Sequence, residues 1–143
     1  MKDPQIDSET AMSVVRNCLV VTIQGELNDD LLLRIRTNIL GKILATKVRG
    51  LILDFSTVRA LDSFAFNSFT ATAKMASLLG ISIVFVGLQP GVVSALVDLG
   101  VEIAGVDAAL TIEDAFEQLQ NIPSIQDEPE DAEDIDNGNS LAF

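Results

Sequence analysis

Two apolar runs separated by a helical pattern constrain the fold of this chain more than any other feature. The first run is Leu51-Ile52-Leu53, and the second covers residues 81–86, bounded by Gly80 and Gly87. Between them, over residues 63–79, apolar side chains recur at helical spacing. Because buried parallel strands are apolar on both faces and need a crossover connection, this order predicts a βαβ unit in an α/β domain.

The segment before this unit has the pattern of a β-hairpin. Residues 13–16 and 18–24 are rich in β-forming side chains and are separated by Asn17, a residue that suits a turn. Along the second segment Leu19, Val21 and Ile23 alternate with Val20, Thr22 and Gln24, and Gly25 ends it.

A helix is predicted over about residues 30–46, because Asn28-Asp29-Asp30 offers an N-cap and acidic residues for its first turn. One helical face is apolar and is expected to pack on the sheet; it consists of Leu32, Ile35, Ile39 and Ile43.

The C-terminal part of the domain carries further boundary signals. Pro90 suits the first position of a helix, and Gly100 suits the position just after its end. Residues 101–103 are expected to add a short edge strand. Residues 111–114 have the form of a capping box that begins a last amphipathic helix, and Pro123 ends the domain.

Both long helices carry more apolar residues than one buried face needs. The extra residues are Leu33, Leu40 and Leu44 in the first helix, and Phe64, Ala71, Met75 and Leu78 in the helix after residue 63. They indicate either a contact with a second subunit or a broad core within the domain, and the sequence leaves both interpretations open.

The expected organisation is an N-terminal extension at residues 1–12, one domain at 13–122 and a disordered acidic tail at 123–143. The tail has seven acidic and no basic residues, so it cannot bury enough apolar surface to order itself. The N-terminus lacks the apolar segment of a secretory signal, no run is long enough to cross a bilayer, and Cys18 is the single cysteine. We therefore expect a cytoplasmic protein without membrane association.

Residues missing from the chain limit its chemistry. The sequence contains no His, Trp or Tyr, which excludes Ser-His-Asp and Cys-His catalysis and argues against a zinc site. The Walker A pattern is also absent. We expect a protein that is not an enzyme and that uses no metal or cofactor.

Charge is distributed unevenly along the chain. All 9 basic side chains lie in residues 1–74, whereas residues 75–143 hold 13 of the 21 acidic ones. This acidity argues against nucleic-acid binding, which needs cations to neutralise phosphates, and favours a basic protein surface as a partner.

Ser63 is the main candidate for a functional residue. It lies at the predicted start of a helix, where its hydroxyl is expected to cap the helix and to stay near the surface. A loop that leads into a helix suits a phosphoacceptor, because a kinase must reach the hydroxyl. From the residues alone, an unregulated N-cap is the other interpretation. Ser94, in the helix after Pro90, is a second candidate phosphorylation site.

Asp54, at the end of the first apolar run, is interpreted as a turn-capping carboxylate. A receiver domain places its phosphoacceptor aspartate at such a strand end, but it also needs acidic metal ligands and a later lysine. No lysine follows Lys74.

Two motifs resemble the STAS fold of anti-sigma factor antagonists, over roughly residues 13–121. The first leads from Leu51-Ile52-Leu53-Asp54-Phe55 to Leu61-Asp62-Ser63-Phe64, and the second is the G-x-x-P…L-V-x-L-G pattern of residues 87–100. Antagonists tend to show Asp-Ser-Ser-Gly at the helix start, whereas here Phe64 and Ala65 follow the serine. This difference makes the chain look like the RsbS-type scaffold of the bacterial stressosome. The resemblance implies a mixed central sheet of about four to five strands, with a β-hairpin start and then parallel strands, and about four helices.

The resemblance also implies a function in the general stress response or a related signalling output. In the RsbS-type family the unmodified scaffold assembles with an RsbR-type sensor paralogue into a large complex and holds an RsbT-type serine kinase captive. Phosphorylation of the serine releases the kinase, and a resetting phosphatase reverses the change. Carried over, Ser63 is the phosphoacceptor, and the residues expected to contact a partner are Asp62, Phe64, Asp54 and Arg59.

Two alternatives remain open within the same fold. One is a free anti-sigma factor antagonist, whose unmodified form binds an anti-sigma kinase. The other is an accessory STAS module that binds a nucleotide or serves lipid transport.

Overall fold

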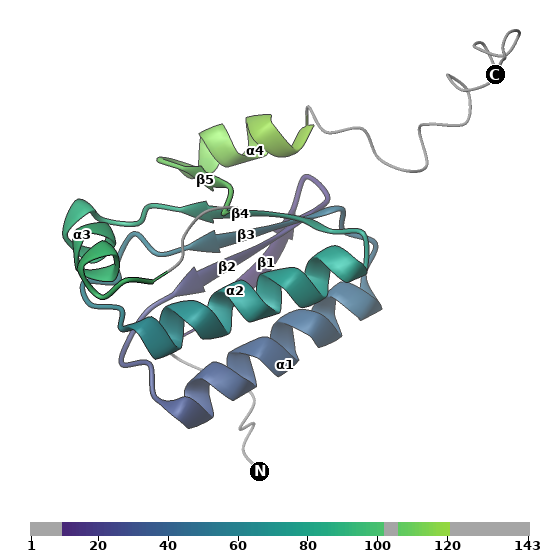
Figure 1. The fold of residues 1–143 in the computed structure, drawn as a ribbon. Coiled ribbons are helices and arrows are strands. Elements are labelled where there is room, and N and C mark those ends of the chain that lie inside the picture. The colour runs from purple at the N-terminus through teal and green to yellow at the C-terminus, as the bar shows by residue number, and fades with distance from the viewer. Residues whose placement is uncertain (1–9, 102–105, 121–143) are drawn as a thin grey trace, which may run out of the picture.

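The computed structural model describes residues 10–101 and 106–120 of the chain. Five strands and four helices follow one another in these ranges (Figure 1). In chain order they are β1 Thr10–Val15, β2 Cys18–Ile23, α1 Asp29–Ala45, β3 Gly50–Asp54, α2 Ser63–Leu78, β4 Ser82–Val86, α3 Pro90–Asp98, β5 Ala108–Ala109 and α4 Ile112–Gln120.

The strands form one mixed sheet in the order β1-β2-β3-β4-β5. β1 is antiparallel to β2, and every other neighbouring pair is parallel, with Leu53 opposite Phe85 in the β3–β4 pair. The predicted βαβ unit, β3-α2-β4, is therefore confirmed at the centre of the sheet. Figure 1 shows α1 and α2 side by side on one face of the sheet, α4 on the other, and α3 at the end where the parallel strands finish.

The predicted hairpin is confirmed, with shifted ends. β1 begins at Thr10, which pairs with Ile23, rather than at residue 13, because the antiparallel ladder extends along the whole of β2. The turn between the strands is Arg16 and Asn17, which both have positive φ, 52° and 63°. Two left-handed residues are what a type I′ turn requires, and the Asn favours this conformation more than the Arg does.

The main core lies between the sheet and the α1–α2 layer. The predicted inner face of α1 is buried, as is the inner row of α2; the buried side chains of these two helices are Leu31, Leu32, Ile35, Ile39, Ile43, Ala65, Phe66, Phe69, Thr72 and Ala76. Phe55 lies at the centre of this core, with its ring centroid 5.1 Å from that of Phe69 and 5.4 Å from that of Phe85.

A smaller core covers the opposite face of the sheet. Helix α4 packs Phe116 and Leu119 against Ile52 and Val84, and its N-terminus is capped by the Thr111 hydroxyl, which accepts from Asp114 N at 3.1 Å. Burial in this core raises the pKa of the Cys18 thiol, while the nearby charge of Arg49 acts in the opposite direction. The thiol is therefore held in its neutral, weakly nucleophilic form.

The end of the domain differs in part from the prediction. α3 begins at Pro90 as predicted, and Gly100 follows it with a φ of +76°. The edge strand is β5 at Ala108–Ala109, not at residues 101–103; Val101 is not in a strand, and residues 102 and 103 lie outside the described ranges. A pair of alanines carries no strand signal, so the sequence favoured the more β-like Val-Glu-Ile.

The extra apolar residues of the long helices do not widen the core, which corrects one of the two interpretations. Leu33 is 60% exposed, Leu44 72%, Phe64 60% and Leu78 86%. Leu40 and Ala71 are half-buried. The structure therefore leaves apolar side chains on the outer surface of the α1–α2 layer. In the described ranges, no helix has the length and hydropathy needed to cross a membrane.

Candidate functional site

The loop between β3 and α2 presents Ser63, and several long-range hydrogen bonds hold it in place. Phe55 N donates to Val86 O at 2.8 Å, the Thr57 hydroxyl to Ile23 O at 3.2 Å, and Gln89 Nε2 to Ser56 O at 2.8 Å. The loop is therefore tied to the ends of β2 and β4 and to the residue before α3. Val58 and Leu61 of the loop are buried in the main core, so apolar packing holds the loop in addition to these hydrogen bonds.

Asp54 shapes the first turn of this loop. The residue is only 8% exposed, and its Oδ1 accepts a 2.9 Å hydrogen bond from Ser56 N. This is the turn-capping role expected from the sequence. Little of this residue is therefore open to direct contact from outside the domain.

Helix α2 is capped by Asp62 and not by Ser63, which corrects the expected role of the serine. Asp62 has an extended backbone conformation, and its Oδ1 accepts from Ala65 N at 2.7 Å. Ser63 is the first residue of the helix. Both residue types are good caps, so the sequence could not distinguish two neighbours.

Replacing Asp62 by alanine is expected to lower the free energy of unfolding by about 1 kcal/mol, because Ala65 N loses its acceptor. Urea unfolding followed by circular dichroism measures this change. Asp62→Asn is the matched control, since asparagine caps helices as well as aspartate does. Equal stability of wild type and Asp62→Ala would contradict the capping role.

The Ser63 side chain lies at the start of α2 and is partly open to solvent. The side chain is half-buried, and in the described ranges no residue forms a hydrogen bond with its hydroxyl. Asp62, Phe64 and, four residues earlier in the loop, Arg59 are exposed, and Phe64 is 60% exposed. The helix start therefore combines a free nucleophilic oxygen, one carboxylate, one guanidinium in the preceding loop and an apolar ring.

Ser94, the second candidate site, lies on the exposed surface of α3. No hydrogen bond of its side chain to another described residue is found. It is accessible, and the hydrogen bond that ties α3 to the loop before α2 comes from Gln89 and not from Ser94.

The sequence did not identify Thr57, Gln89 and Gly87 as parts of the site. Gly87 has a φ of +76°, and a Cβ built on it would lie 2.9 Å from Ser56 Cβ and 3.0 Å from Ser56 Cα. The β4–α3 connection thus lies against the Ser56 turn with no room for a side chain. The glycine of the G-x-x-P motif was a usable signal, but the two side-chain tethers join residues 33 and 34 positions apart, which no local pattern reveals.

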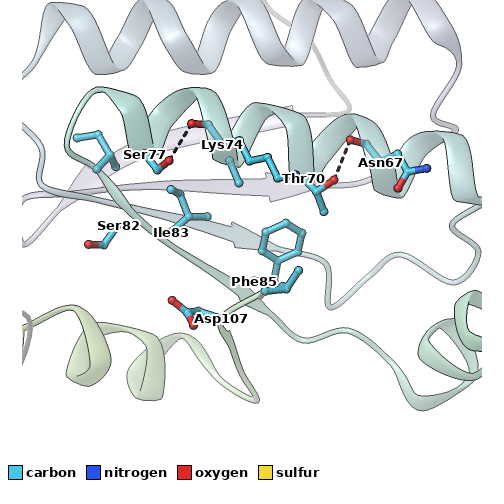
Figure 2. Close-up of a pocket in the computed structure, with 11 residues that line it drawn as sticks. Asn67, Thr70, Lys74, Ser77, Ser82, Ile83, Phe85 and Asp107 are labelled. Carbon is cyan, nitrogen blue, oxygen red and sulfur yellow. Dashed lines mark hydrogen bonds between the residues drawn. The ribbon is translucent and has the colours of Figure 1, made fainter. Parts of the chain in front are cut away.

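A groove with a volume of about 420 Å³ lies beside α2, separate from the helix start. Figure 2 shows its lining, which consists of Asn67, Thr70, Lys74 and Ser77 from α2, Ser82, Ile83 and Phe85 from β4, and Asp107, with three further residues unlabelled. Two of its hydroxyls are already bonded within α2, since Thr70 donates to Asn67 O at 2.9 Å and Ser77 to Lys74 O at 2.8 Å. One cation and one carboxylate remain as its charged groups.

The described part of the chain shows no group of three or more Cys, Asp or Glu side chains that could hold a metal ion. The tethered loop, the Ser63 hydroxyl without a partner among the described residues, and the exposed side chains next to it thus lie together at the start of α2.

The family of the chain follows from comparison with known sequences. The STAS domain family matches residues 9–119, which cover every strand and almost all of α4. The chain belongs to the STAS domain family. In a comparison with curated proteins, none matches the chain.

Solved structures of STAS proteins have the same fold. A serine-to-glutamate variant of RsbS from Moorella thermoacetica has a TM-score of 0.69 and 25% identity, over 78% of this chain and 95% of that one. A chain from a structure described as the molecular architecture of the stressosome, a signal integration and transduction hub, has a TM-score of 0.68 and 27% identity. The match covers 78% of this chain and 96% of that one. The unphosphorylated anti-sigma factor antagonist SpoIIAA has a TM-score of 0.63 and 20% identity, over 80% and 99%, and shows the shared fold alone. The chain is thus similar to signalling proteins of this family.

Proposed function

We propose that this chain is a non-catalytic scaffold of a stressosome and that it sequesters a switch serine kinase until Ser63 is phosphorylated. The observation that carries the proposal is the unbonded Ser63 hydroxyl at the start of α2, beside the exposed ring of Phe64 and on a loop fixed by three long-range hydrogen bonds. The similarity to an RsbS variant and to a stressosome chain supports the same role.

The fold can accept a phosphate at Ser63 without unfolding. The first N–H groups of a helix have no partner within the helix, and Asp62 occupies only that of Ala65. The remaining groups can hydrogen-bond phosphate oxygens, as helix N-termini commonly do. Modification therefore changes the surface of the domain and leaves its core in place.

The added charge would release the kinase. A phosphoserine carries about −1.5 to −2 charges, and it would stand next to Asp62, close in sequence to buried Asp54, with Arg59 as the cation of the loop. A partner surface that fits the apolar ring of Phe64 and the unmodified hydroxyl would meet a desolvated anion. A penalty of about 1.4 kcal/mol weakens binding tenfold.

Phosphorylation by an RsbT-type kinase from the same genome tests the proposal. With labelled ATP, the full chain is expected to take up phosphate, Ser63→Ala to take up none, and Ser94→Ala to behave as the wild type. Ser63→Asp is expected to bind the kinase about tenfold more weakly than Ser63→Ala. Equal labelling of Ser63→Ala and the wild type would refute the assignment.

The proposed role includes further partners. An RsbR-type sensor paralogue would co-assemble with the chain into a large complex, a phosphatase would reset Ser63, and the freed kinase would activate a general stress response or a related output in a bacterial cytoplasm. The exposed apolar side chains on the α1–α2 layer support self-association.

A free anti-sigma factor antagonist is the second candidate, favoured by the shared fold with SpoIIAA. It predicts a one-to-one complex with an anti-sigma kinase. Size-exclusion chromatography with the sensor paralogue separates the two roles, because only the scaffold elutes as a large assembly.

A ligand-binding accessory module is the third candidate, and the groove beside α2 is the observation that favours it. Lys74 is the single cation among the described residues that line the groove, and the carboxylate of Asp107 would repel a phosphate. A nucleotide therefore fits the groove poorly. Titration with nucleotides, followed by chemical-shift changes at Lys74 and Ile83, tests this role.

A further inference from the structure

An exposed apolar strip runs along the seam between α1 and α2. The seam is marked by Arg36, whose Nε donates to the Thr72 hydroxyl at 3.1 Å. Leu44 lies near the C-terminal end of α1, Met75 lies one turn beyond Thr72 in α2, and Leu78 lies one turn beyond Met75, so all three are close to the end of the seam (Figure 1). We define Leu44, Met75 and Leu78, which are 72%, 37% and 86% exposed, as the seam strip.

Basic side chains gather at the same end of the domain, where the parallel strands begin. Lys42 is in the last turn of α1, Lys47 and Arg49 lie in the connection to β3, and Arg16 forms the hairpin turn. Arg49 N donates to Asn17 O at 2.7 Å, which fixes the connection against that turn. We call these four cations the basic end.

Helix α4 ends beside the basic end, on the other face of the sheet. The Arg16 guanidinium lies 4.8 Å from the centroid of the Phe116 ring. One turn later, Leu119 packs so closely on Gly50 that a Cβ there would lie 2.8 Å from Leu119 Cδ1. The end of α4 therefore lies close to Arg16 and to Gly50, the neighbour of Arg49.

The composition of residues 121–143 matches what lies along the path from α4 to the seam strip. Seven acidic residues occur between positions 127 and 136, with no Lys or Arg, and Leu141 and Phe143 follow them. A chain that passes from α4 around the end of the sheet where the parallel strands begin would meet the basic end first and the apolar strip second. A flexible segment of about 20 residues has a root-mean-square span of about 25 Å, enough to cross layers packed about 10 Å apart.

We propose that residues 121–143 fold back over the basic end of their own domain and that Leu141 and Phe143 cover the seam strip. The acidic residues are attracted to the four cations of the basic end, and the contact of Leu141 and Phe143 with the seam strip determines where the segment binds. Any protein that uses the strip must first displace this segment, so the segment competes with assembly through the α1–α2 layer. The proposal does not depend on the role of Ser63.

Tryptophan fluorescence of the full chain tests the proposal, because the natural sequence has no Trp or Tyr to interfere. In Phe143→Trp, emission is expected to be blue-shifted and protected from acrylamide, compared with a peptide of residues 121–143 that carries the same change. Adding Leu44→Ser and Leu78→Ser is expected to remove both effects. Changing Glu130, Asp131, Glu133 and Asp134 to their amides is expected to weaken them.

Leu110→Ser is the matched control, because Leu110 is 83% exposed but lies beside β5 and outside the strip. It is expected to leave the emission of Phe143→Trp unchanged. Emission equal to that of the free peptide, or unaffected by the strip variants, would overturn the proposal. So would a red shift on dilution, because it would mean that the segment of a second copy occupies the strip.

Discussion

Replacing Phe55 by alanine is expected to lower the free energy of unfolding by about 3–5 kcal/mol. The Phe55 ring is fully buried, edge-on to Phe69 at 5.1 Å and stacked on Phe85 at 5.4 Å. Its removal leaves a cavity where the loop, α2 and β4 meet. The hydrogen bond from Phe55 N to Val86 O holds the backbone of the loop in place, so the loop cannot move inward to fill this cavity. The free energy of unfolding of a typical domain is about 5–15 kcal/mol, so the substitution is expected to remove a large share of its stability.

Urea unfolding measures this loss, and Phe64→Ala is the matched control. The Phe64 ring is 60% exposed, so its truncation is expected to change stability by less than about 0.5 kcal/mol. The comparison separates the structural phenylalanine from the one that a partner can reach. A loss below about 1 kcal/mol in Phe55→Ala would contradict the central place of this ring in the core.

Replacing Gly87 by alanine is expected to destabilise the domain by about 2–5 kcal/mol. A left-handed backbone costs an alanine about 1–2 kcal/mol, and overpacking adds about 1–3 kcal/mol. The new Cβ would lie 2.9 Å from Ser56 Cβ and 3.1 Å from Ser56 N, the group that donates to Asp54. The turn before Ser63 would have to shift.

Gly100→Ala isolates the first of these two costs. Gly100 has the same φ of +76°, but a Cβ there meets no atom of the described residues within 4 Å. Its substitution is expected to cost only about 1–2 kcal/mol. Denaturant midpoints of the two variants give the difference directly, and equal losses would show that Ser56 moves aside without cost.

The sequence was sufficient for the elements whose signals are local. The apolar runs predicted β3 and β4, alternation predicted the hairpin, and Pro90 and Gly100 bounded α3. These patterns report burial and backbone conformation, which neighbouring residues determine. The order of these predicted elements resembled the STAS fold, and the family match to residues 9–119 confirms that resemblance.

The details of the site depend on contacts between distant segments, and these the sequence did not reveal. Asp62 rather than Ser63 caps α2, because the approach of the loop decides which of two suitable neighbours turns toward Ala65. The Gln89 tether to Ser56 depends on the β4–α3 connection, which only the folded sheet brings close. The positive φ of Arg16 follows from the register of the hairpin and not from any preference of arginine.

The cover that α4 gives to the second face of the sheet has a consequence for the order of folding. Ile52 and Val84 belong to the central strands, but among the described elements they are covered on this side by α4, the last one made. During synthesis the sheet and the α1–α2 layer can form while this face is still open to solvent. A chain interrupted before residue 112 would expose an apolar sheet surface that is prone to aggregation. Formation of α4 is therefore needed to shield this surface from other chains.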